Sequence, residues 1–347
     1  MAANQTLKTE GRNVTLRDVA NALGVSKATV SLAINRSNLV ACKTRDRILK
    51  KIEELGYVYN RKAASMSTGK TRTLGLSVHD ITNPYFTEVC AAIESVLSQH
   101  GMMSFLCNTN ESIERQERFI GTLTEHQADG LILCPSAGTN VKSLQPLIKR
   151  SLPTVLLTRD IKGAELDFVG NDDFLALKLV TEHLIGLGHH RIAMIGGGQR
   201  TSASKLRRAG YYAAMEESGL AVDQTLVIDC VTKPKAGEEA VKEVLAHRNP
   251  PTAISCFTDL IALGVISGLY RMGATPGRDI AVVGCDDIEE AGRAYVQLTT
   301  AKVQKWAIGQ TAADVLMQRI ADPDLPLQRI IIQPALIIRE SCGSRFN

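Results

Sequence analysis

The sequence predicts an α/β protein in which a small helical head precedes a larger body of two doubly wound lobes. The chain has 347 residues, which is too long for one ordinary hydrophobic core. From residue 73 onward, short apolar runs alternate with helical patterns, as in repeated strand-helix-strand units around a parallel sheet. Residues 1–72 hold 14 Lys or Arg against 5 Asp or Glu, whereas the remainder holds 26 against 31. This asymmetry favours a head that meets a polyanion, although a basic flexible tail would carry the same charge.

Two short helices are expected at the start of the head. Apolar residues at positions 16, 19, 20 and 23 have the spacing of one helical face, and Gly24 ends that helix. Thr15 with Asp18 is a loose capping box at its start. A second helix is expected from Ser26, whose hydroxyl can cap the first turn, and it turns apolar residues 30, 33 and 34 inward. Two helices joined by Gly-Val-Ser indicate a helix-turn-helix, which is a weak signal by itself.

The exposed face of the second helix strengthens that interpretation. Small or basic residues remain on this face and could enter a major groove: Lys27, Ala28, Ser31 and Leu32. The amino end of the helix also directs backbone amides at phosphate. A third helix is expected over 44–55, and its four basic residues fit an ordinary solvated face as well as a DNA contact.

The body is expected to repeat strand and helix in order. Strands are expected over 74–78, 103–106, 130–134, 154–157, 191–195, 226–229, 253–257 and 280–285. Helices are expected over 84–100, 112–126, 143–150, 174–187 and 204–218. The rhythm restarts after Val169, so the boundary between the lobes is placed near Gly170. The last segment predicts a strand from 298, a helix, and an apolar run over 328–339 broken by Pro334.

Several patterns that could hold chemistry are incomplete. Glycines 196–198 suggest a nucleotide-binding turn, but Thr201 stands where the third glycine of the motif belongs. Asp286 follows an apolar strand beside Cys285, and without distant His or Cys partners a carboxylate facing a cleft is favoured over a metal ligand. No nucleophile elbow and no paired acid and base are found. We therefore predict no cofactor, no metal site and no enzymatic activity.

The cellular setting is also predicted from composition. The eight cysteines contain no Cys-x-x-Cys pair, which favours free thiols in a reducing compartment. No run is apolar enough for a signal peptide or a membrane span. We expect a cytoplasmic protein that joins the nucleoid when it is bound to DNA.

The head and the segment after it resemble a known family. The runs that carry the resemblance are VTLRDVANALGVSKATVSLAIN (14–35) and NRKAASMSTGKTRTLGL (60–76). They are similar to the DNA-binding head and hinge of the lactose-repressor/galactose-repressor (LacI/GalR) family of bacterial transcription regulators, and the resemblance covers nearly the whole chain. It implies a head over 14–59, a hinge over 60–71 and a body like periplasmic sugar-binding proteins. The implied lobes are 72–169 plus about 302–333, and 170–301 plus about 334–347.

The resemblance implies roles for residues of the head. Family members read base edges with the two residues that match Lys27 and Ala28. Leu32 stands where Arg is common, so contact with a thymine methyl is its expected use. Met66 matches a Leu that is inserted into the minor groove, and the alternative is a flexible linker with an incidental Met. The candidate DNA-binding residues are Thr15, Leu16, Ser26, Lys27, Ala28, Thr29, Ser31, Leu32, Asn35, Tyr57, Asn60, Ala63 and Met66.

The resemblance also implies an effector site between the lobes. Arg207 matches the family's effector-binding arginine, Asp286 matches a carboxylate after a Val-Val-Gly strand, and residues 80–86 match an Asp-x-x-Asn-Pro-Phe-Phe run. A guanidinium, a carboxylate and an aromatic wall suit vicinal hydroxyls, although Arg207 could instead only pair with a carboxylate across the lobes. Departures from the family pattern at 158, 258 and 303 favour a ligand other than the usual hexose, or none. The candidate effector-binding residues are Asp80, Asn83, Tyr85, Phe86, Arg207, Thr258, Asp259 and Asp286.

Together these patterns predict a transcription regulator, and a repressor is favoured. The expected partners are double-stranded operator DNA, a small-molecule effector and a second copy of the chain, because one head contacts only a half-site. No heptad tail follows residue 339, which favours a dimer over a tetramer. The alternative is a sugar-binding transport protein that shares the body fold, and a nucleotide-binding enzyme is a weaker third.

Overall fold

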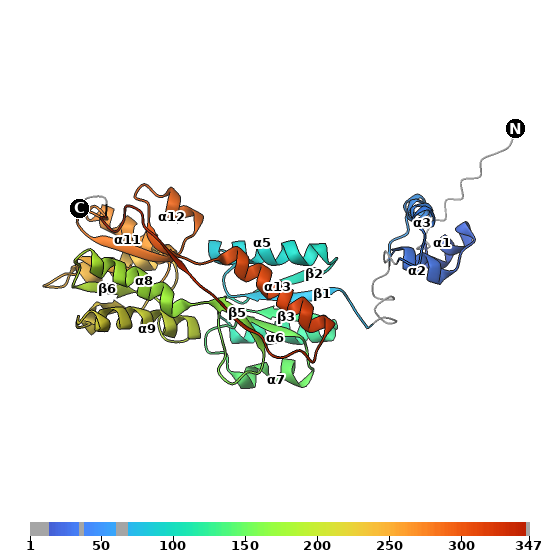
Figure 1. Cartoon of the computed structure of the whole chain (residues 1–347), viewed down its shortest axis with the longest axis horizontal. Helices are drawn as coiled ribbons and strands as arrows, with labels where there is room; N and C mark the ends of the chain where they lie inside the picture. Colours follow the sequence, from blue (N-terminus) through green and yellow to red (C-terminus); the bar gives the residue numbers. More distant parts are fainter. Residues whose placement is uncertain (1–13, 35–37, 60–68, 345–347) are drawn as a thin grey trace. The chain divides into compact units, whose positions relative to one another are not determined.

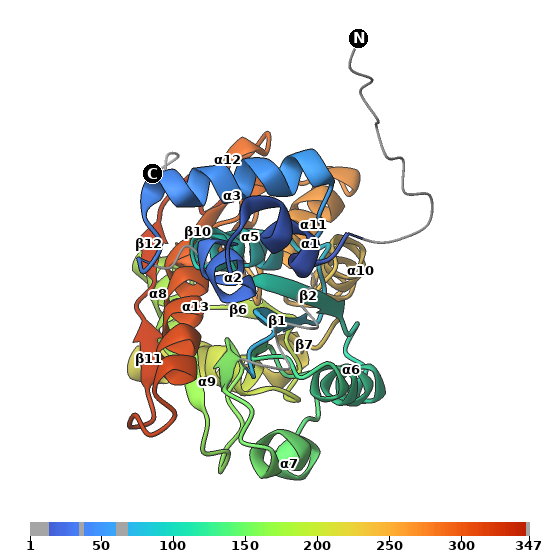
Figure 2. The same cartoon turned by 90° about the vertical axis from the view of Figure 1, so that its right-hand side faces the viewer.

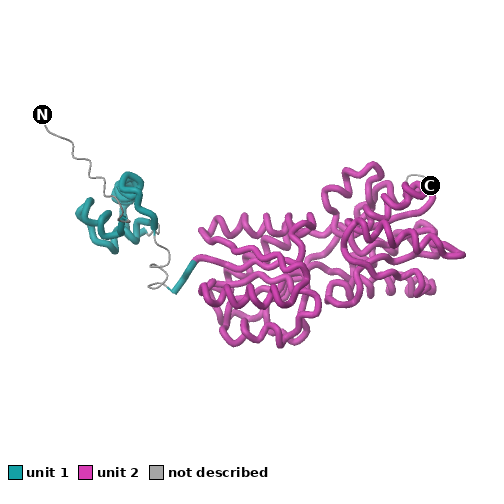
Figure 3. Tube along the Cα trace, turned by 180° about the vertical axis from the view of Figure 1, so that it is seen from behind, with its two compact units in different colours: residues 1–71 teal, residues 72–347 magenta. Residues whose placement is uncertain are grey.

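The structure is a computed structural model that describes residues 14–34, 38–59 and 69–344. The chain divides into two compact units, Met1–Thr71 and Arg72–Asn347, which are coloured separately in Figure 3. We call the first unit the head and the second the body.

The described part of the head contains three helices: α1 (Leu16–Leu23), α2 (Lys27–Ile34) and α3 (Cys42–Leu55). The two expected caps are confirmed. The Thr15 amide donates to the Asp18 carboxylate at 2.8 Å, while the Thr15 hydroxyl accepts from the Asp18 amide at 3.4 Å. The Ser26 hydroxyl accepts from the Thr29 amide at 3.0 Å, so α2 begins where the sequence predicts. Gly24 ends α1 with a φ of 66°, the left-handed conformation that glycine adopts at little cost.

A small core holds the three helices together. Val19, Val30 and Ile48 are fully buried in it, one from each helix. Because these residues fix α2 against both neighbours, the opposite face of α2 is left outside the core. The packing of this core therefore fixes the orientation of the exposed face of α2.

In the described residues of the body, the strands form two six-stranded sheets. The first has the order β11-β5-β4-β3-β1-β2, and every neighbouring pair is parallel. We call this half the N-lobe. Its strands are β1 (Thr73–Val78), β2 (Met103–Asn108), β3 (Gly130–Leu133), β4 (Thr154–Leu157), β5 (Asp167–Asn171) and β11 (Arg329–Ile332). Its helices are α5 (Pro84–Gln99), α6 (Ile113–Glu125), α7 (Val141–Lys149) and α13 (Lys305–Ala321).

The second sheet has the order β12-β10-β9-β8-β6-β7 and belongs to the half that we call the C-lobe. Its strands are β6 (Ile192–Ile195), β7 (Val227–Ile228), β8 (Ala253–Cys256), β9 (Ala281–Asp286), β10 (Thr299–Lys302) and β12 (Ala335–Ile337). Its helices are α8 (Asp173–Gly186), α9 (Ser202–Glu217), η1 (Gln224–Leu226), α10 (Pro234–Leu245), α11 (Asp259–Arg271) and α12 (Glu289–Arg293). The edge strand β12 pairs antiparallel with β10, whereas the other pairs are parallel.

Helices cover both faces of each sheet, as doubly wound folds require. In the N-lobe, α5 and α13 pack against each other on one face, while α6 and α7 cover the other (Figures 1 and 2). In the C-lobe, α8 and α9 share one face, and α10 with α11 cover the other. The alternating apolar strand residues are therefore buried on both sides.

Within residues 72–344 the chain passes between the lobes three times. It crosses after β5, again between β10 and α13, and last between β11 and β12. Figure 1 shows the long C-terminal segment running from α13 back to the C-lobe. The ends of the central strands of both sheets consequently meet at one inter-lobe cleft.

Some helices and strands of the body were not predicted from the sequence. Strand β5 is fully buried, but its polar ends and Gly170 hide it as a strand in the sequence. Helices α10 and α11 were also not anticipated. The described residues contain no helix with the length and hydrophobicity needed to cross a bilayer.

Candidate functional site

The outer face of α2 carries the residues with which the head could read DNA. Lys27 and Ala28 are exposed, and Leu32 is 36% exposed. The hydroxyls of Ser26 and Thr29 are 2.8 Å apart and fix the first turn of the helix. Ser26, Lys27, Ala28 and Thr29 lie at the amino end of α2, which is the positive pole of the helix dipole and suits a polyanionic partner.

Other head residues are committed to the fold. Tyr57 is only 9% exposed and packs in the head core, and its DNA contact stays a prediction. Leu16 is half-buried against the same core, and Thr15 is held in the capping box. Arg47 donates to the Leu23 carbonyl at 3.2 Å and so ties α3 to the end of α1. The predicted contacts at Asn35, Asn60, Ala63 and Met66 lie outside the described residues.

A polar cavity lies between the lobes, with walls from both. The N-lobe contributes Asn83, Tyr85 and Phe86 from the start of α5. The C-lobe contributes Arg207 from α9 and Asp286 from the end of β9. The cavity has a volume of about 60 Å³, room for several water molecules. With Thr258, the structure thus brings together six of the eight predicted effector residues in the lining of this cavity.

Arg207 is held between two carboxylates of its own lobe. Its Nε donates to Asp173 Oδ1 at 2.7 Å and its Nη2 to Asp286 Oδ1 at 3.1 Å. Its Nη1 donates to the Phe257 carbonyl at 2.7 Å, and the guanidinium lies 4.8 Å from the centre of the Phe257 ring. Burial raises the pKa of both carboxyls, and the charge of Arg207 opposes that rise. Arg207 is thus paired with carboxylates, as in the predicted alternative, but both ion pairs lie within the C-lobe and not across the lobes.

Asp286 is further fixed through its backbone. Its φ of 126° and the φ of 53° at Asp287 are left-handed values that side-chain-bearing residues rarely adopt. The Lys305 ammonium donates to the carbonyls of these two residues at 2.9 and 2.7 Å. Since Lys305 opens α13, this contact couples the floor of the cavity to a helix that packs on the N-lobe.

Two buried polar atoms of the cavity wall have no hydrogen-bond partner among the described residues. Asn171 is 7% exposed and Thr258 is 4% exposed, and both line the cavity. The carboxamide oxygen of Asn171 and the hydroxyl of Thr258 make no hydrogen bond. A buried polar group without a partner is costly, so these two atoms point to a ligand with hydrogen-bonding groups.

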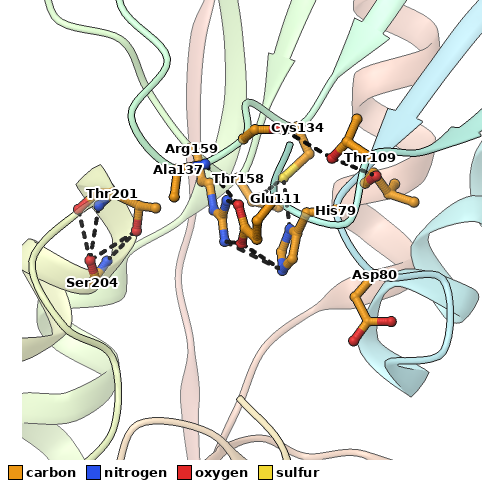
Figure 4. A network of polar contacts seen from close by, with 12 residues as sticks. His79, Asp80, Thr109, Glu111, Cys134, Ala137, Thr158, Arg159, Thr201 and Ser204 are labelled. Carbon is orange, nitrogen blue, oxygen red and sulfur yellow. Dashed lines mark hydrogen bonds and ion pairs between the residues drawn. The ribbon is translucent and has the colours of Figure 1, made fainter. Parts of the chain in front are cut away.

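The N-lobe wall is a network of polar contacts built at the ends of four strands (Figure 4). Arg159 donates to both carboxylate oxygens of Glu111, at 3.0 and 2.8 Å, and to the Pro135 carbonyl at 2.9 Å. Its Nη2 also lies 3.3 Å from His79 Nε2. Because arginine can only donate, His79 Nε2 must accept, and the ring proton is on Nδ1, 3.6 Å from the Cys134 sulfur.

The charges of this network are fixed by burial and pairing. Burial lowers the pKa of His79 to about 3, and the nearby Arg159 charge adds to the shift. Burial alone would raise the pKa of Glu111, but the hydrogen bonds and charge of Arg159 lower it to about 2. At neutral pH the wall therefore holds a neutral imidazole beside a compensated ion pair.

Two predicted effector residues have other roles in the structure. Asp80 accepts from Lys233 of the C-lobe at 2.6 Å and so bridges the mouth of the cleft. Asp259 is fully buried and outside the cavity lining, where it accepts from the Thr300 hydroxyl at 2.6 Å and the Ile288 amide at 2.9 Å. An effector contact through Asp259 would require these bonds to break.

Three residues that complete the surroundings of Arg207 were not predicted from the sequence: Asn171, Asp173 and Phe257. A usable signal was present, because Asn171 and Asp173 follow the point at which the strand-helix rhythm restarts. Polar residues at a strand end where the chain changes lobes are well placed for a cleft.

The described residues contain no cluster of His, Cys, Asp or Glu that could hold a metal ion.

A helix-turn-helix head and a two-lobed body with a polar cavity between its lobes define a class of protein. This class comprises DNA-binding transcription regulators with an effector-binding domain. Residues 15–60 match the family described as bacterial regulatory proteins, lacI family. Residues 71–340 match the family described as periplasmic binding proteins and sugar binding domain of LacI family. The chain belongs to the LacI family of bacterial regulatory proteins.

Individual relatives agree with that membership. The HTH-type transcriptional repressor PurR of Haemophilus influenzae (strain PittEE) is 34% identical over 334 residues, which are 95% of this chain and 99% of that protein. The ribose operon repressor of Escherichia coli (strain K12) is 33% identical over 328 residues, 94% of this chain and 99% of the relative. A solved structure of the transcriptional regulator CelR in complex with cellobiose is 29% identical with a TM-score of 0.73, covering 95% of this chain and all of that one.

Proposed function

We propose that this protein is a repressor that binds a palindromic operator as a homodimer. The exposed, partly basic face of α2 is the observation that supports base reading. Lys27, Ala28 and Leu32 would meet base edges, with Ser26, Thr29 and Ser31 near the phosphates. One such head would contact only a half-site, so a two-fold pair of heads is needed for tight binding.

The operator affinity is set by a small molecule in the inter-lobe cavity. This part of the proposal is supported by the oxygens of Asn171 and Thr258, which have no hydrogen-bond partner among the described residues. A ligand that hydrogen-bonds to both removes the free-energy cost of burying them unpaired. Arg207 and Asp286 present further donors and acceptors, and Tyr85 and Phe86 offer an apolar wall. This chemistry suits a compact molecule rich in hydroxyl groups.

The effector would act by changing the relative angle of the lobes. In this scheme the lobes are 72–169 plus about 302–333 and 170–301 plus about 334–347, and residues 60–71 form the hinge to the head. A ligand that bonds across the cavity favours one lobe angle over another, and thereby one arrangement of paired hinges. The work of the protein is binding and switching, with no catalytic step.

Base reading is tested by selection from the genomic DNA of the source organism. Fragments that bind the full-length protein are sequenced, and the selected operator is measured again with Lys27→Ala. We expect this variant to change the preference at particular base pairs by about 1–3 kcal/mol each. An equal loss of affinity on every duplex would show that Lys27 contacts only phosphate.

Effector control is tested on the same operator with a metabolite screen and Thr258→Val. This change removes the unpartnered hydroxyl and keeps the side-chain shape, so the folded state should be unaffected or slightly more stable. A metabolite that alters operator affinity should need at least about tenfold more ligand in the variant, the equivalent of one lost hydrogen bond of about 1.4 kcal/mol. An unchanged dose response would place the ligand elsewhere.

A further inference from the structure

A second hollow lies outside the inner cavity, at another part of the cleft. It has a volume of about 690 Å³ and takes walls from both lobes. Arg159 lines both the inner cavity and this outer hollow. A third hollow of about 670 Å³ links them, because it shares His79, Asn83 and Phe257 with the inner cavity and Arg200 and Thr201 with the outer hollow. We call this second space the outer compartment. Figure 4 shows Arg159 and Thr201, two residues of its wall, on facing sides of the cleft.

Four exposed cations line the outer compartment, and they come from three stretches of the chain. Lys142 lies in the first turn of α7, and Lys162 follows β4. Arg200 precedes α9, and Lys205 lies in its first turn. Arg200 reaches across the cleft, since its Nη2 would lie 3.8 Å from a Cβ placed on Gly138 of the N-lobe.

These four side chains carry uncompensated charge. Within the described residues, none of them makes an ion pair or a side-chain hydrogen bond, although Lys178, Lys233 and Lys305 of the same body all do. Asp160 is the one carboxylate among the described residues of this lining, and it already pairs with Arg329 at 2.9 Å. Arg159 is likewise neutralised by Glu111. Such a positive cluster is unexpected in a body that carries more acidic than basic residues.

Two helices also begin in the lining of this space, with their first turns capped by the side chains of Asn140 and Thr201. The first residues of α7 and α9, Val141 and Ser202, are both in the lining. Helix amino ends carry partial positive charge, which adds to the four side chains. Like charges that face one hollow repel each other, and a bound anion would relieve that repulsion.

We propose that the outer compartment binds a phosphate group, and that the effector is therefore a phosphate ester. The inference rests on the proposed effector function of the inner cavity. The hydroxyl-bearing part of the ligand occupies the inner cavity, and its phosphate lies among Lys142, Lys162, Arg200 and Lys205. The inner cavity alone has room for only several water molecules, so a ligand anchored there extends into the adjoining space.

The site is tested with inorganic phosphate on the full-length protein without DNA. Phosphorus NMR line widths are followed through a titration at constant ionic strength. We expect saturable broadening that needs at least about tenfold more phosphate in the double variant Arg200→Gln with Lys205→Gln. Lys235→Gln is the matched control, because Lys235 is an exposed lysine of α10 outside this lining. Circular dichroism establishes that each variant is folded.

Two outcomes would overturn the site. One is the absence of saturable broadening, and the other is an equal response in the double variant and in wild type, as expected if the basic head alone attracts the anion. The result does not depend on operator binding. Failure of the proposed DNA function would therefore appear in the fragment selection and leave this titration unaffected.

A second arm identifies the source of the phosphate. A hexose 6-phosphate and a pentose 5-phosphate are each compared with the free sugar and with inorganic phosphate. An ester that binds at least tenfold more tightly than inorganic phosphate supports the phosphorylated effector. Equal affinities would overturn that assignment and show a separate phosphate site. Thr258→Val should weaken the ester and leave inorganic phosphate unchanged, because the hydroxyl lies in the inner cavity.

Discussion

Burial decides what individual residues of the cleft can do, and Arg207 is the clearest case. Its guanidinium is 7% exposed and compensates two buried carboxylates, so it is part of the structure as well as of the cavity wall. Sequence resemblance located Arg207 and Asp286. It could not show that Asp173 completes the cluster, because that contact depends on how α8 and α9 pack.

Replacing Arg207 should therefore destabilise the body. Arg207→Ala removes the paired guanidinium from Asp173 and Asp286 and leaves Lys305 as the nearby positive charge of Asp286. We expect the free energy of unfolding to fall by about 3–5 kcal/mol. Urea denaturation followed by circular dichroism measures this change. A loss below about 1 kcal/mol would show that the two carboxyls are compensated in another way. Thr258→Val is consequently the cleaner variant for testing the effector.

His79 gives the body a pH dependence that can be isolated. The pKa of its imidazole is about 3 in the folded chain and about 6.5 when unfolded. Between these values the unfolded chain binds more protons, so stability falls as the pH falls through 6.5. From pH 7.5 to 5.5 we expect this residue to remove about 1.4 kcal/mol.

The measurement is the urea unfolding free energy of wild type and His79→Gln at the two pH values. The variant should lose about 1.4 kcal/mol less than wild type over this interval. Glu111 does not obscure the comparison, because its contribution to stability is lost only as the pH falls below its unfolded pKa of 4.5, outside this interval. Equal losses in the two proteins would contradict the neutral, buried imidazole.

At the scale of elements, close helix packing sets the shape of the cleft. Helices α8 and α9 meet at Gly210, where a Cβ would lie 2.1 Å from the Phe174 carbonyl oxygen. Gly210 follows Arg207 by three residues on α9. The physical reason for a glycine here, a backbone contact with the preceding helix, became clear only from the structure.

Gly210→Ala should force α9 away from α8 and displace Arg207 with it. We expect a loss of about 3 kcal/mol, near the upper end of overpacking costs. Gly121→Ala is the control, because Gly121 also lies inside a helix but has open space around it. That control should gain about 0.5–1 kcal/mol, since alanine is the better helix former. If both variants gave the same change in urea denaturation, the close contact would not matter.

Most helices and strands were predictable because the spacing of their apolar residues follows the face that is buried. The caps at Thr15 and Ser26 and the strands flanked by turns were found in this way. Strand β5 was missed because it ends in polar residues, Asp167 and Asn171, and the burial of Asp167 depends on its contact with the distant Arg319. Local sequence does not report such contacts. The buried Asp259 was assigned to the cleft for the same reason, since a position at a strand end does not fix a side-chain direction.

At the scale of the whole molecule, the distribution of charge and the connectivity assign DNA binding and effector binding to different parts of the chain. The basic residues concentrate in the first 72 positions, and the effector cavity forms far along the chain where the lobes meet. Periodicity predicted two doubly wound lobes. The three crossings between them follow from non-local strand pairing, such as β11 with β5, which no periodic pattern encodes.

The central claim is that the head reads base sequence, and one affinity ratio tests it most directly. The full-length protein is titrated at moderate salt against its selected operator and against a shuffled duplex of the same length and composition. The account predicts at least about a thousandfold preference for the operator. Equal affinity for the two duplexes, with and without candidate effectors, would contradict it.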